Sequence, residues 1–368
     1  MIPVYKPYFP KGALRYAHDA LASTWVSSKG KYLNKVKEKL AEIWGTEYII
    51  LTNSGTAANH LMARTLKKRY IERRNLVVPN NVYVAAWNPF VMEGYILNPI
   101  DAFKETWNID YEKIGEEHWG KAILIVHNLG NIVNVPLLRR KYPNTPFIED
   151  NCEGFGGSYE GKPSGTASDM FTVSFFGNKN LTSGEGGAFV TYDEEFYLEA
   201  YKFWGQGMRL EARTRFIHDD IGHNYRMTNV EAAILYGQLE LMDEIQEKKR
   251  IIFDRYASKF ITYMEDLVYF PLPSPGTKSS DWMFAMGIKE SEYYIAKKFF
   301  DSHGIETRPM FYPITRHGHL REIRCETEVA KILSKEGIIL PSYPSLREDT
   351  QDYIMKKVIE YVGELTLL

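Results

Sequence analysis

The sequence predicts an α/β protein whose larger part is a mostly parallel sheet covered by helices on both faces. Short apolar segments recur through the first half of the chain, and longer segments with helical spacing separate most of them. Parallel strands need such long crossovers, and the crossovers are usually helices. The expected strands are residues 48–51, 76–79, 95–97, 122–126, 146–149, 170–175 and 188–191.

Helices are expected on both sides of the first strand. Residues 13–23 and 32–43 have amphipathic spacing, and Ser54-Gly55-Thr56 opens a helix that runs to about residue 70. Further along, Thr228 is expected to cap a long helix, which residues 248–256 continue. The apolar residues that predict one buried stripe on this helix are Val230, Ala233, Ile234, Gly237 and Leu241.

The C-terminal third reads as a smaller α+β domain. A turn at residues 272–276 precedes an expected strand at 282–288 and an expected helix at 291–302. A helix pair follows and ends at residues 352–362. We therefore predict a large domain at residues 1–244 and a small domain at residues 245–368.

Composition narrows the functional class. The chain has 368 residues, 44% hydrophobic and 25% charged, with a net charge of −2. This is the profile of an ordinary globular protein, and its charge offers no support for nucleic-acid binding. The sequence holds only two cysteines, Cys152 and Cys325, so neither a disulfide framework nor a cysteine zinc site is expected.

The sequence also predicts a cytoplasmic protein that has neither a membrane-spanning helix nor a metal site. No apolar run approaches the length of a transmembrane helix, and the N-terminus lacks a signal-like apolar core. His317 and His319 flank Gly318, but no acids or cysteines stand at metal-ligand spacing. We expect these histidines to lie on an exposed loop.

A lysine and an acid carry the main chemical prediction. Lys179 lies in Ser174-Phe-Phe-Gly-Asn-Lys179 before a glycine-rich turn, and the apolar run Phe147-Ile-Glu-Asp150 ends in an acid. Pyridoxal 5′-phosphate needs these groups, since a lysine amine forms a Schiff base with its aldehyde and a carboxylate keeps its pyridine nitrogen protonated. A lone lysine beside glycine is more often a solvated turn residue, but the other expected parts of such a site follow in order.

A phosphate site is expected where a strand ends and a helix begins. Helix N-termini offer free backbone N–H groups and attract phosphate. Gly55 permits close approach and Thr56 adds a hydroxyl donor in the segment Asn53-Ser-Gly-Thr-Ala-Ala58. A capping serine with no ligand is the alternative reading of this segment taken alone.

The chain resembles the DegT/DnrJ family of nucleotide-sugar aminotransferases over almost its whole length. The resemblance implies pyridoxal phosphate fold type I, the aspartate aminotransferase fold, with a seven-stranded sheet. The stretches that carry it are Trp25-Val-Ser-Ser-Lys-Gly-Lys-Tyr32, Asn53 to Ala58, Glu149 to Glu153, Ser174 to Gly187, Gly222 to Asn229, and Gly304 to Pro309.

The resemblance also implies roles for individual residues. Lys179 and Asp150 are the implied catalytic pair, with pyridoxamine phosphate as the other form of the cofactor. The further implied cofactor-binding residues are Gly55, Thr56, Tyr83, Glu153, Ser174 and Asn224, and the implied substrate-binding residues are Ser28, Arg226 and Arg308. Asn224 is expected to come from the neighbouring subunit of a homodimer with shared sites. Tyr83 is expected to stack on the cofactor ring, with a core tyrosine as the alternative.

The resemblance implies amino transfer from L-glutamate to a nucleotide-linked keto-sugar. Gly177-Asn178-Lys179 resembles the string of family members that act at C4 of a 4-keto-6-deoxyhexose. Trp25-Val-Ser-Ser28 and the Asn224 to Asn229 string also resemble perosamine synthase and its relatives, which favours the same position. Amino transfer to C3 of a 3-keto sugar remains open, as do a family 3-dehydratase and a non-catalytic regulator. Lys179 argues against the dehydratase, which carries histidine there. The sequence does not choose among UDP, dTDP and GDP.

Two stretches depart from the family pattern. They are Asn80-Asn-Val-Tyr83 with Trp87, and Asn128-Leu-Gly130. Both lie near positions that are expected to shape the pocket, so they bear on the identity of the sugar.

Overall fold

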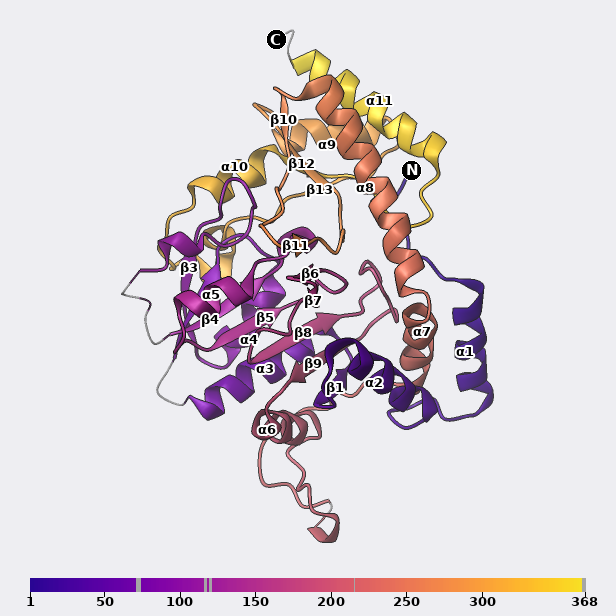
Figure 1. Cartoon of the computed structure of the whole chain (residues 1–368), viewed down its shortest axis with the longest axis vertical. Helices are drawn as coiled ribbons and strands as arrows, with labels where there is room; N and C mark the ends of the chain where they lie inside the picture. Colours follow the sequence, from indigo (N-terminus) through magenta and orange to yellow (C-terminus); the bar gives the residue numbers. More distant parts are fainter. Residues whose placement is uncertain (71–73, 116–117, 119–120, 215, 366–368) are drawn as a thin grey trace.

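A seven-stranded sheet forms the centre of the larger part of the molecule (Figure 1). The computed structural model describes residues 1–70, 74–115, 118, 121–214 and 216–365. The strand order is β1-β9-β8-β5-β4-β2-β3. The strands are β1 Ile49–Thr52, β2 Asn75–Pro79, β3 Ile96–Ile100, β4 Ala122–Val126, β5 Phe147–Asp150, β8 Met170–Ser174 and β9 Gly187–Thr191.

Six of these strands run in the same direction, and five of them are parallel neighbours, as the alternating sequence predicts. Their register pairs β3, β2, β4, β5 and β8 in one direction. Strand β9 reverses direction and pairs antiparallel with both β8 and β1. Because β5 and β8 are parallel neighbours, Asp150 and Ser174 end their strands at the same edge of the sheet. All seven expected strands are present.

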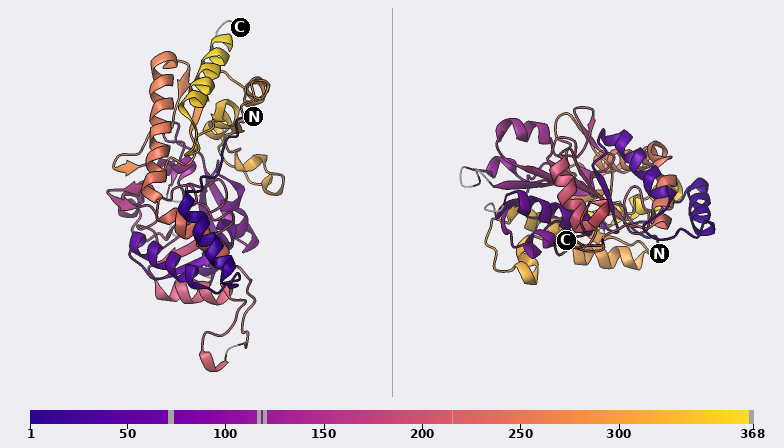
Figure 2. Two further views of the ribbon diagram at one scale, coloured as in Figure 1. Left: turned by 90° about the vertical axis from the view of Figure 1, so that its right-hand side faces the viewer. Right: turned by 90° about the horizontal axis from the view of Figure 1, so that it is seen from below.

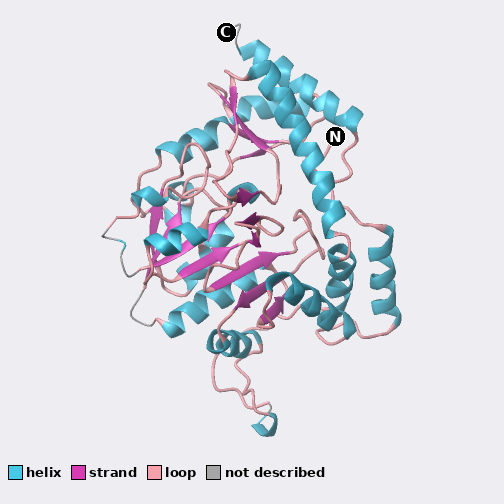
Figure 3. Ribbon diagram, viewed as in Figure 1, coloured by secondary structure: helices cyan, strands magenta, loops and turns pink. Residues whose placement is uncertain are grey.

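Helices cover both faces of the sheet (Figures 1 and 3). Trp87 and Phe90 lie in the apolar core on the α3 side, and Trp44 and Phe175 lie in the core on the other side. The helices of this part are α1 Lys11–Ala22, α2 Lys31–Trp44, α3 Gly55–Arg69, α4 Asn88–Met92, α5 Val135–Lys141, α6 Glu194–Trp204 and α7 Asn229–Leu239.

Helix α7 begins where the sequence predicts but is buried differently. Thr228 and Glu231 form a reciprocal capping box at its N-terminus. The expected single stripe is wrong, because Val230 and Ile234 are only partly buried while Leu235 and Gln238 are buried. Helices α1 and α2 both pack against α7, so it is enclosed on more than one side.

The C-terminal part has its own sheet (Figure 1) and its own apolar core. Its strands, in the order β10-β12-β14-β13, are β10 Val268–Tyr269, β12 Ala285–Ile288, β14 Gly337–Ile339 and β13 Arg308–Pro309. Its helices are α8 Met242–Met264, α9 Tyr293–Ser302, α10 Glu328–Glu336 and α11 Glu348–Leu365. Tyr256, Phe284 and Phe300 lie in its core. The domain boundary at residue 245 stays a prediction, since α8 runs through it without interruption.

Two further features bear on the site. A sheet of two-residue strands joins β6 Ser158–Tyr159, β7 Lys162–Pro163 and β11 Thr277–Lys278, linking the two parts of the chain. The segment after α6 extends away from the body as a hairpin that closes at Gly205 and Asn224 (Figure 2). No helix in the described part of the chain is both long and apolar enough to cross a membrane.

Candidate active site

A cavity of about 620 Å³ lies at the edge of the sheet where β5 and β8 end. Its walls come from the start of α3, the loop after β2, the ends of β5 and β8, and the turn after β8. The C-terminal part closes it with residues 282–283, 308–312 and His317. The carboxyl edge of a parallel sheet is the usual place for a ligand in this kind of fold.

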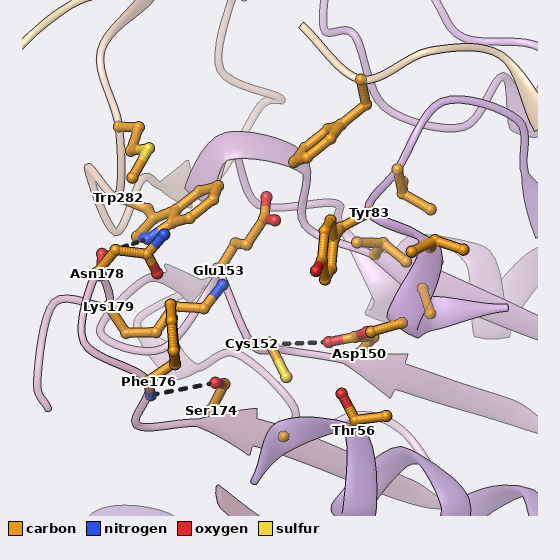
Figure 4. A pocket seen from close by; sticks show the side chains of 18 of the residues that line it. Thr56, Tyr83, Asp150, Cys152, Glu153, Ser174, Phe176, Asn178, Lys179 and Trp282 are labelled. Atoms are coloured by element: carbon orange, nitrogen blue, oxygen red, sulfur yellow. Dashed lines mark hydrogen bonds between the residues drawn. The ribbon is translucent and has the colours of Figure 1, made fainter. Parts of the chain in front are cut away.

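Lys179 extends into this cavity from the turn after β8 (Figure 4). Its Nζ lies 4.0 Å from the centre of the Trp282 ring. Its backbone is fixed, because the Tyr5 hydroxyl donates to the Lys179 carbonyl at 2.6 Å. No carboxylate in the described part of the chain forms an ion pair with Nζ, so the amine can react with a ligand.

Asp150 faces the cavity from the last position of β5, and both of its carboxylate oxygens accept hydrogen bonds. The Cys152 backbone N–H donates to Oδ1 at 3.1 Å, and the Asn59 side-chain amide donates to Oδ2 at 2.8 Å. Asn59 lies one turn into α3 and is buried. Its own oxygen accepts from the Thr172 hydroxyl at 2.6 Å, which fixes the amide orientation.

The preceding acid, Glu149, has a different place. Successive strand residues face opposite sides of a sheet. Glu149 is fully buried, and its Oε2 lies 2.7 Å from Nε2 of His127. His127 Nδ1 accepts from the Val133 backbone N–H, so Nε2 is the donor to Glu149. This pair holds β4 and β5 together and leaves Asp150 as the acid on the cavity side.

The start of α3 forms the other end of the cavity. Ser54 caps the helix by accepting from the Ala57 N–H at 3.1 Å. Gly55 packs so closely on β8 that a Cβ there would lie 2.7 Å from Cβ of Ser174. Thr56 is exposed and faces the cavity, and Ser174 lies across from it (Figure 4). These residues make a place where an anion can approach backbone N–H groups.

Glu153 is the third titratable side chain in the cavity. It is 5% exposed, and its Oε2 accepts from the Leu129 N–H at 2.8 Å. Burial raises the pKa of Glu153 to about 7, although Lys179 and the Leu129 N–H act in the opposite direction. The carboxyl group can therefore hold or release a proton near neutral pH.

The outer half of the cavity is aromatic and basic. Tyr83 is 61% exposed, with its ring 6.4 Å from that of Phe311, so it is no core residue. Its stacking role remains a prediction. Arg308 lines the same wall on β13 and forms no ion pair with another described residue.

Three of the predicted site residues lie outside the cavity of their own chain. Ser28 precedes α2, and Asn224 and Arg226 lie on the far side of β1, where Arg226 bridges to Thr52. The Arg226 Nε donates to the Asn224 side chain at 2.8 Å, and Asn224 is exposed. Their roles in cofactor and substrate binding stay predictions.

The sequence reading missed three residues that the fold brings to the site. Asn59 follows Gly55 by one helical turn, so helical spacing alone could have identified it. Trp282 had no local signal, since it reaches Lys179 from the C-terminal part. His317 was expected on an exposed loop with His319. His319 is exposed, but His317 lines the cavity, and its Nε2 is buried without a partner among the described residues.

Most of the residues that depart from the family pattern lie behind the cavity wall and do not line the cavity. Asn80, Asn81 and Asn128 are buried and do not line the cavity. The Asn128 amide donates to the carbonyls of Asn81 and Trp107. Val82 and Tyr83 do line it, so this stretch can influence a substrate directly only through them.

The cavity fits pyridoxal phosphate. It combines one reactive amine, a fixed carboxylate on the opposite wall, and a helix start into which a Cβ at Gly55 would intrude. The amine matches an aldehyde, the carboxylate a pyridinium, and the helix start a phosphate group. Fold and site together define an aminotransferase of the pyridoxal-phosphate type.

Comparison with known proteins gives the family. Residues 10–359 match the DegT/DnrJ/EryC1/StrS aminotransferase family, and the chain belongs to it. It is 35% identical over 373 residues to the GDP-perosamine synthase of Escherichia coli O157:H7, with 99% of each chain covered. It is 32% identical to that of Vibrio cholerae, covering 98% of this chain and 99% of the relative.

The fold is shared with solved sugar aminotransferases. The putative sugar aminotransferase Spr1654 of Streptococcus pneumoniae, in its PMP form, superposes with a TM-score of 0.88 at 21% identity and 99% coverage of both chains. These findings confirm the predicted type I fold, the aminotransferase class and the pyridoxal phosphate cofactor.

Proposed function

We propose that this enzyme transfers the amino group of L-glutamate to C4 of a GDP-linked 4-keto-6-deoxyhexose. The observation that carries the proposal is the full-length similarity to GDP-perosamine synthases at 35% and 32% identity. The Gly177-Asn178-Lys179 string in the cavity supports the same regiochemistry. The products are 2-oxoglutarate and a 4-amino-4,6-dideoxy sugar.

Lys179 performs the proton transfers. Its Nζ accepts the proton that leaves the amino-bearing carbon of glutamate, and it later returns a proton to C4 of the sugar. The bound cofactor supplies an electron sink for the carbanion that forms at those carbons. Trp282 covers the lysine on one side, which limits the positions that the amine can take.

The two carboxyl groups have separate tasks. Asp150 is held in one orientation by hydrogen bonds from Asn59 and the Cys152 N–H and faces the place where a pyridinium would lie. Glu153, whose pKa burial raises to about 7, can hold a proton near neutral pH and would donate it to the ring hydroxyl of the cofactor. Arg308 binds either the glutamate carboxylate or a phosphate of the nucleotide, because its planar fork suits both.

The alternatives are less well supported. A 3-dehydratase of the family would carry histidine at the position of Lys179. A non-catalytic regulator would not need a reactive amine facing a fixed carboxylate. Amino transfer to C3 is the nearest alternative, and only the product distinguishes it.

We also propose a two-fold homodimer with shared sites. Asn224 and Arg226 do not line their own cavity and lie on the edge next to β1, where a neighbouring chain could receive them. The cytoplasmic location of the protein stays a prediction.

Product analysis tests the proposal. The enzyme is incubated with glutamate and, in separate reactions, GDP-, dTDP- and UDP-linked 4-keto-6-deoxyhexoses and their 3-keto isomers. Amination of the GDP-linked 4-keto sugar at C4, established by NMR of the product, is the expected result. Amination at C3, or turnover restricted to another nucleotide, would contradict it. Lys179→Ala is the control and should give no product.

A further inference from the structure

Lys249 is a buried lysine that has no part in the proposed catalytic mechanism. Lys249 lies in α8 and is fully buried. Its Nζ donates to the carbonyls of Trp282 at 2.6 Å and Ser342 at 2.8 Å. Burial lowers the pKa of Lys249 to about 7, although the Asp281 carboxylate acts in the opposite direction. A buried ammonium is costly, so its hydrogen-bond partners identify its role.

The first of those partners reaches the catalytic lysine. Trp282 is 5% exposed, and its ring lies over Nζ of Lys179 at 4.0 Å. Its indole N–H donates to the Asn178 carbonyl at 2.9 Å, one residue before Lys179 (Figure 4). Trp282 therefore contacts Lys249 through its carbonyl and Lys179 through its ring.

The residue beside Lys249 strengthens the same connection. Arg250 forms an ion pair with Asp281 at 3.0 Å, just before Trp282. Asp281 has a φ of 53°, in the left-handed region that few residues occupy. The linker is the segment of residues 279–284 between β11 and β12. Two consecutive basic residues of α8 thus hold two consecutive residues of this linker, the second of which is Trp282.

We propose that Lys249 is a positioning residue, which fixes the Trp282 ring over Lys179 by binding the Trp282 carbonyl. The inference rests on the proposed function only in taking Lys179 as the catalytic lysine. Without Lys249, the linker can shift and the indole no longer confines the amine. The loss of a face-on aromatic contact with an amine predicts an effect on the order of tenfold.

A double-mutant cycle tests this connection. The variants are Lys249→Met, Trp282→Leu and the double variant, and the matched control is Lys248→Met, a partly buried lysine of the same helix that pairs with Glu244. Two quantities are measured: kcat at saturating substrates, and the rate at which the cofactor-free protein takes up pyridoxal phosphate, followed by absorbance. Uptake needs no sugar, so it tests Lys249 even if the sugar has been assigned wrongly.

We expect each single variant to lower both rates by about tenfold and the double variant to be no slower than Trp282→Leu alone. KM for both substrates should stay within about twofold, and Lys248→Met should resemble the wild type. Equal losses from Lys249→Met with and without the tryptophan would show that Lys249 does not act through Trp282 and would overturn the proposal. So would unchanged rates in a folded Lys249→Met protein. If that variant does not fold, Lys249→Gln replaces it in the same cycle.

Discussion

The Asn59 side chain donates a hydrogen bond to the Asp150 carboxylate at 2.8 Å, joining α3 to the end of β5. The Thr172 hydroxyl donates to the other end of the same amide at 2.6 Å. Three neighbouring elements therefore hold the acid in one orientation. Since α3 also provides the phosphate end of the cavity, one helix sets the distance between the two ends of the cofactor site.

Replacing Asn59 should weaken the hold on Asp150. Asn59→Ala removes a charge-assisted hydrogen bond worth roughly 1.5–3 kcal/mol, so kcat should fall at least about tenfold while the fold persists. Steady-state kinetics with excess cofactor measure this, and Asn98→Ala on β3 is a surface control. A kcat within twofold of the wild type would show that Asp150 keeps its orientation without Asn59.

The charge of Asp150 itself should matter more. Asp150→Asn keeps the shape of the side chain but removes the negative charge that faces the pyridine ring. The variant should still bind pyridoxal phosphate but turn over more slowly by a factor of about a hundred or more, as for other preorganised electrostatic groups. Single-turnover kinetics with glutamate measure the half-reaction. An Asp150→Asn enzyme within a few-fold of the wild type contradicts the role.

The sequence predicts the fold well where local signals are strong. Strand β4 is found at the predicted residues 122–126, because five consecutive buried apolar residues leave little ambiguity. The two-residue strands β6, β7 and β11 were missed, since so few residues show no periodicity. The burial of α7 was predicted poorly because it depends on two helices, α1 and α2, that lie far earlier in the chain, as in the contact between Tyr32 and Asn229, which are 197 residues apart.

The same distinction holds for the site. Short motifs beside strand ends contain Lys179, Asp150 and Gly55, so these site residues could be predicted from the sequence alone. Trp282 donates a hydrogen bond to Asn178, which lies 104 residues earlier in the chain. No local sequence pattern predicts that contact. Lys249 is hidden in the same way, since only the folded structure shows it to be buried.

Gly55 should not tolerate a side chain. In Gly55→Ala the new Cβ would meet Ser174 Cβ at 2.7 Å and Cys152 Sγ at 3.1 Å, which pushes α3 away from β8. Overpacking of this kind costs roughly 1–3 kcal/mol, and the affinity for pyridoxal phosphate should fall about tenfold or more. Gly12→Ala is the control, because nothing lies within 4 Å of its Cβ position. Equal cofactor affinity in the two variants would contradict this role for Gly55.

Glu153 should make the stability of the cofactor-free protein depend on pH. Its pKa is raised from 4.5 to about 7, so between these values the folded state keeps a proton that the unfolded state has lost. The contribution of Glu153 to stability therefore falls as pH rises from about 4.5 to 7 and then stays constant. Glu153→Gln removes this dependence.

Thermal unfolding of the two cofactor-free proteins across this pH range measures the effect. The Tm of Glu153→Gln minus that of the wild type should increase from pH 5 to pH 7. A difference that is constant with pH would mean that Glu153 is already ionised at the lower pH.

The last prediction concerns assembly. Lys179 faces the cavity of its own chain, while Asn224 is exposed outside it. In a homodimer with shared sites, Lys179→Ala and Asn224→Ala subunits should each be poorly active alone, but a mixed dimer contains one site with both residues intact. Mixing after subunit exchange should then recover activity, up to about a quarter of the wild-type value when the two chains pair at random. The double variant Lys179→Ala/Asn224→Ala, mixed with wild type, is the control and should show no such gain. A fully active monomer, or no recovery despite verified subunit exchange, would contradict the shared site.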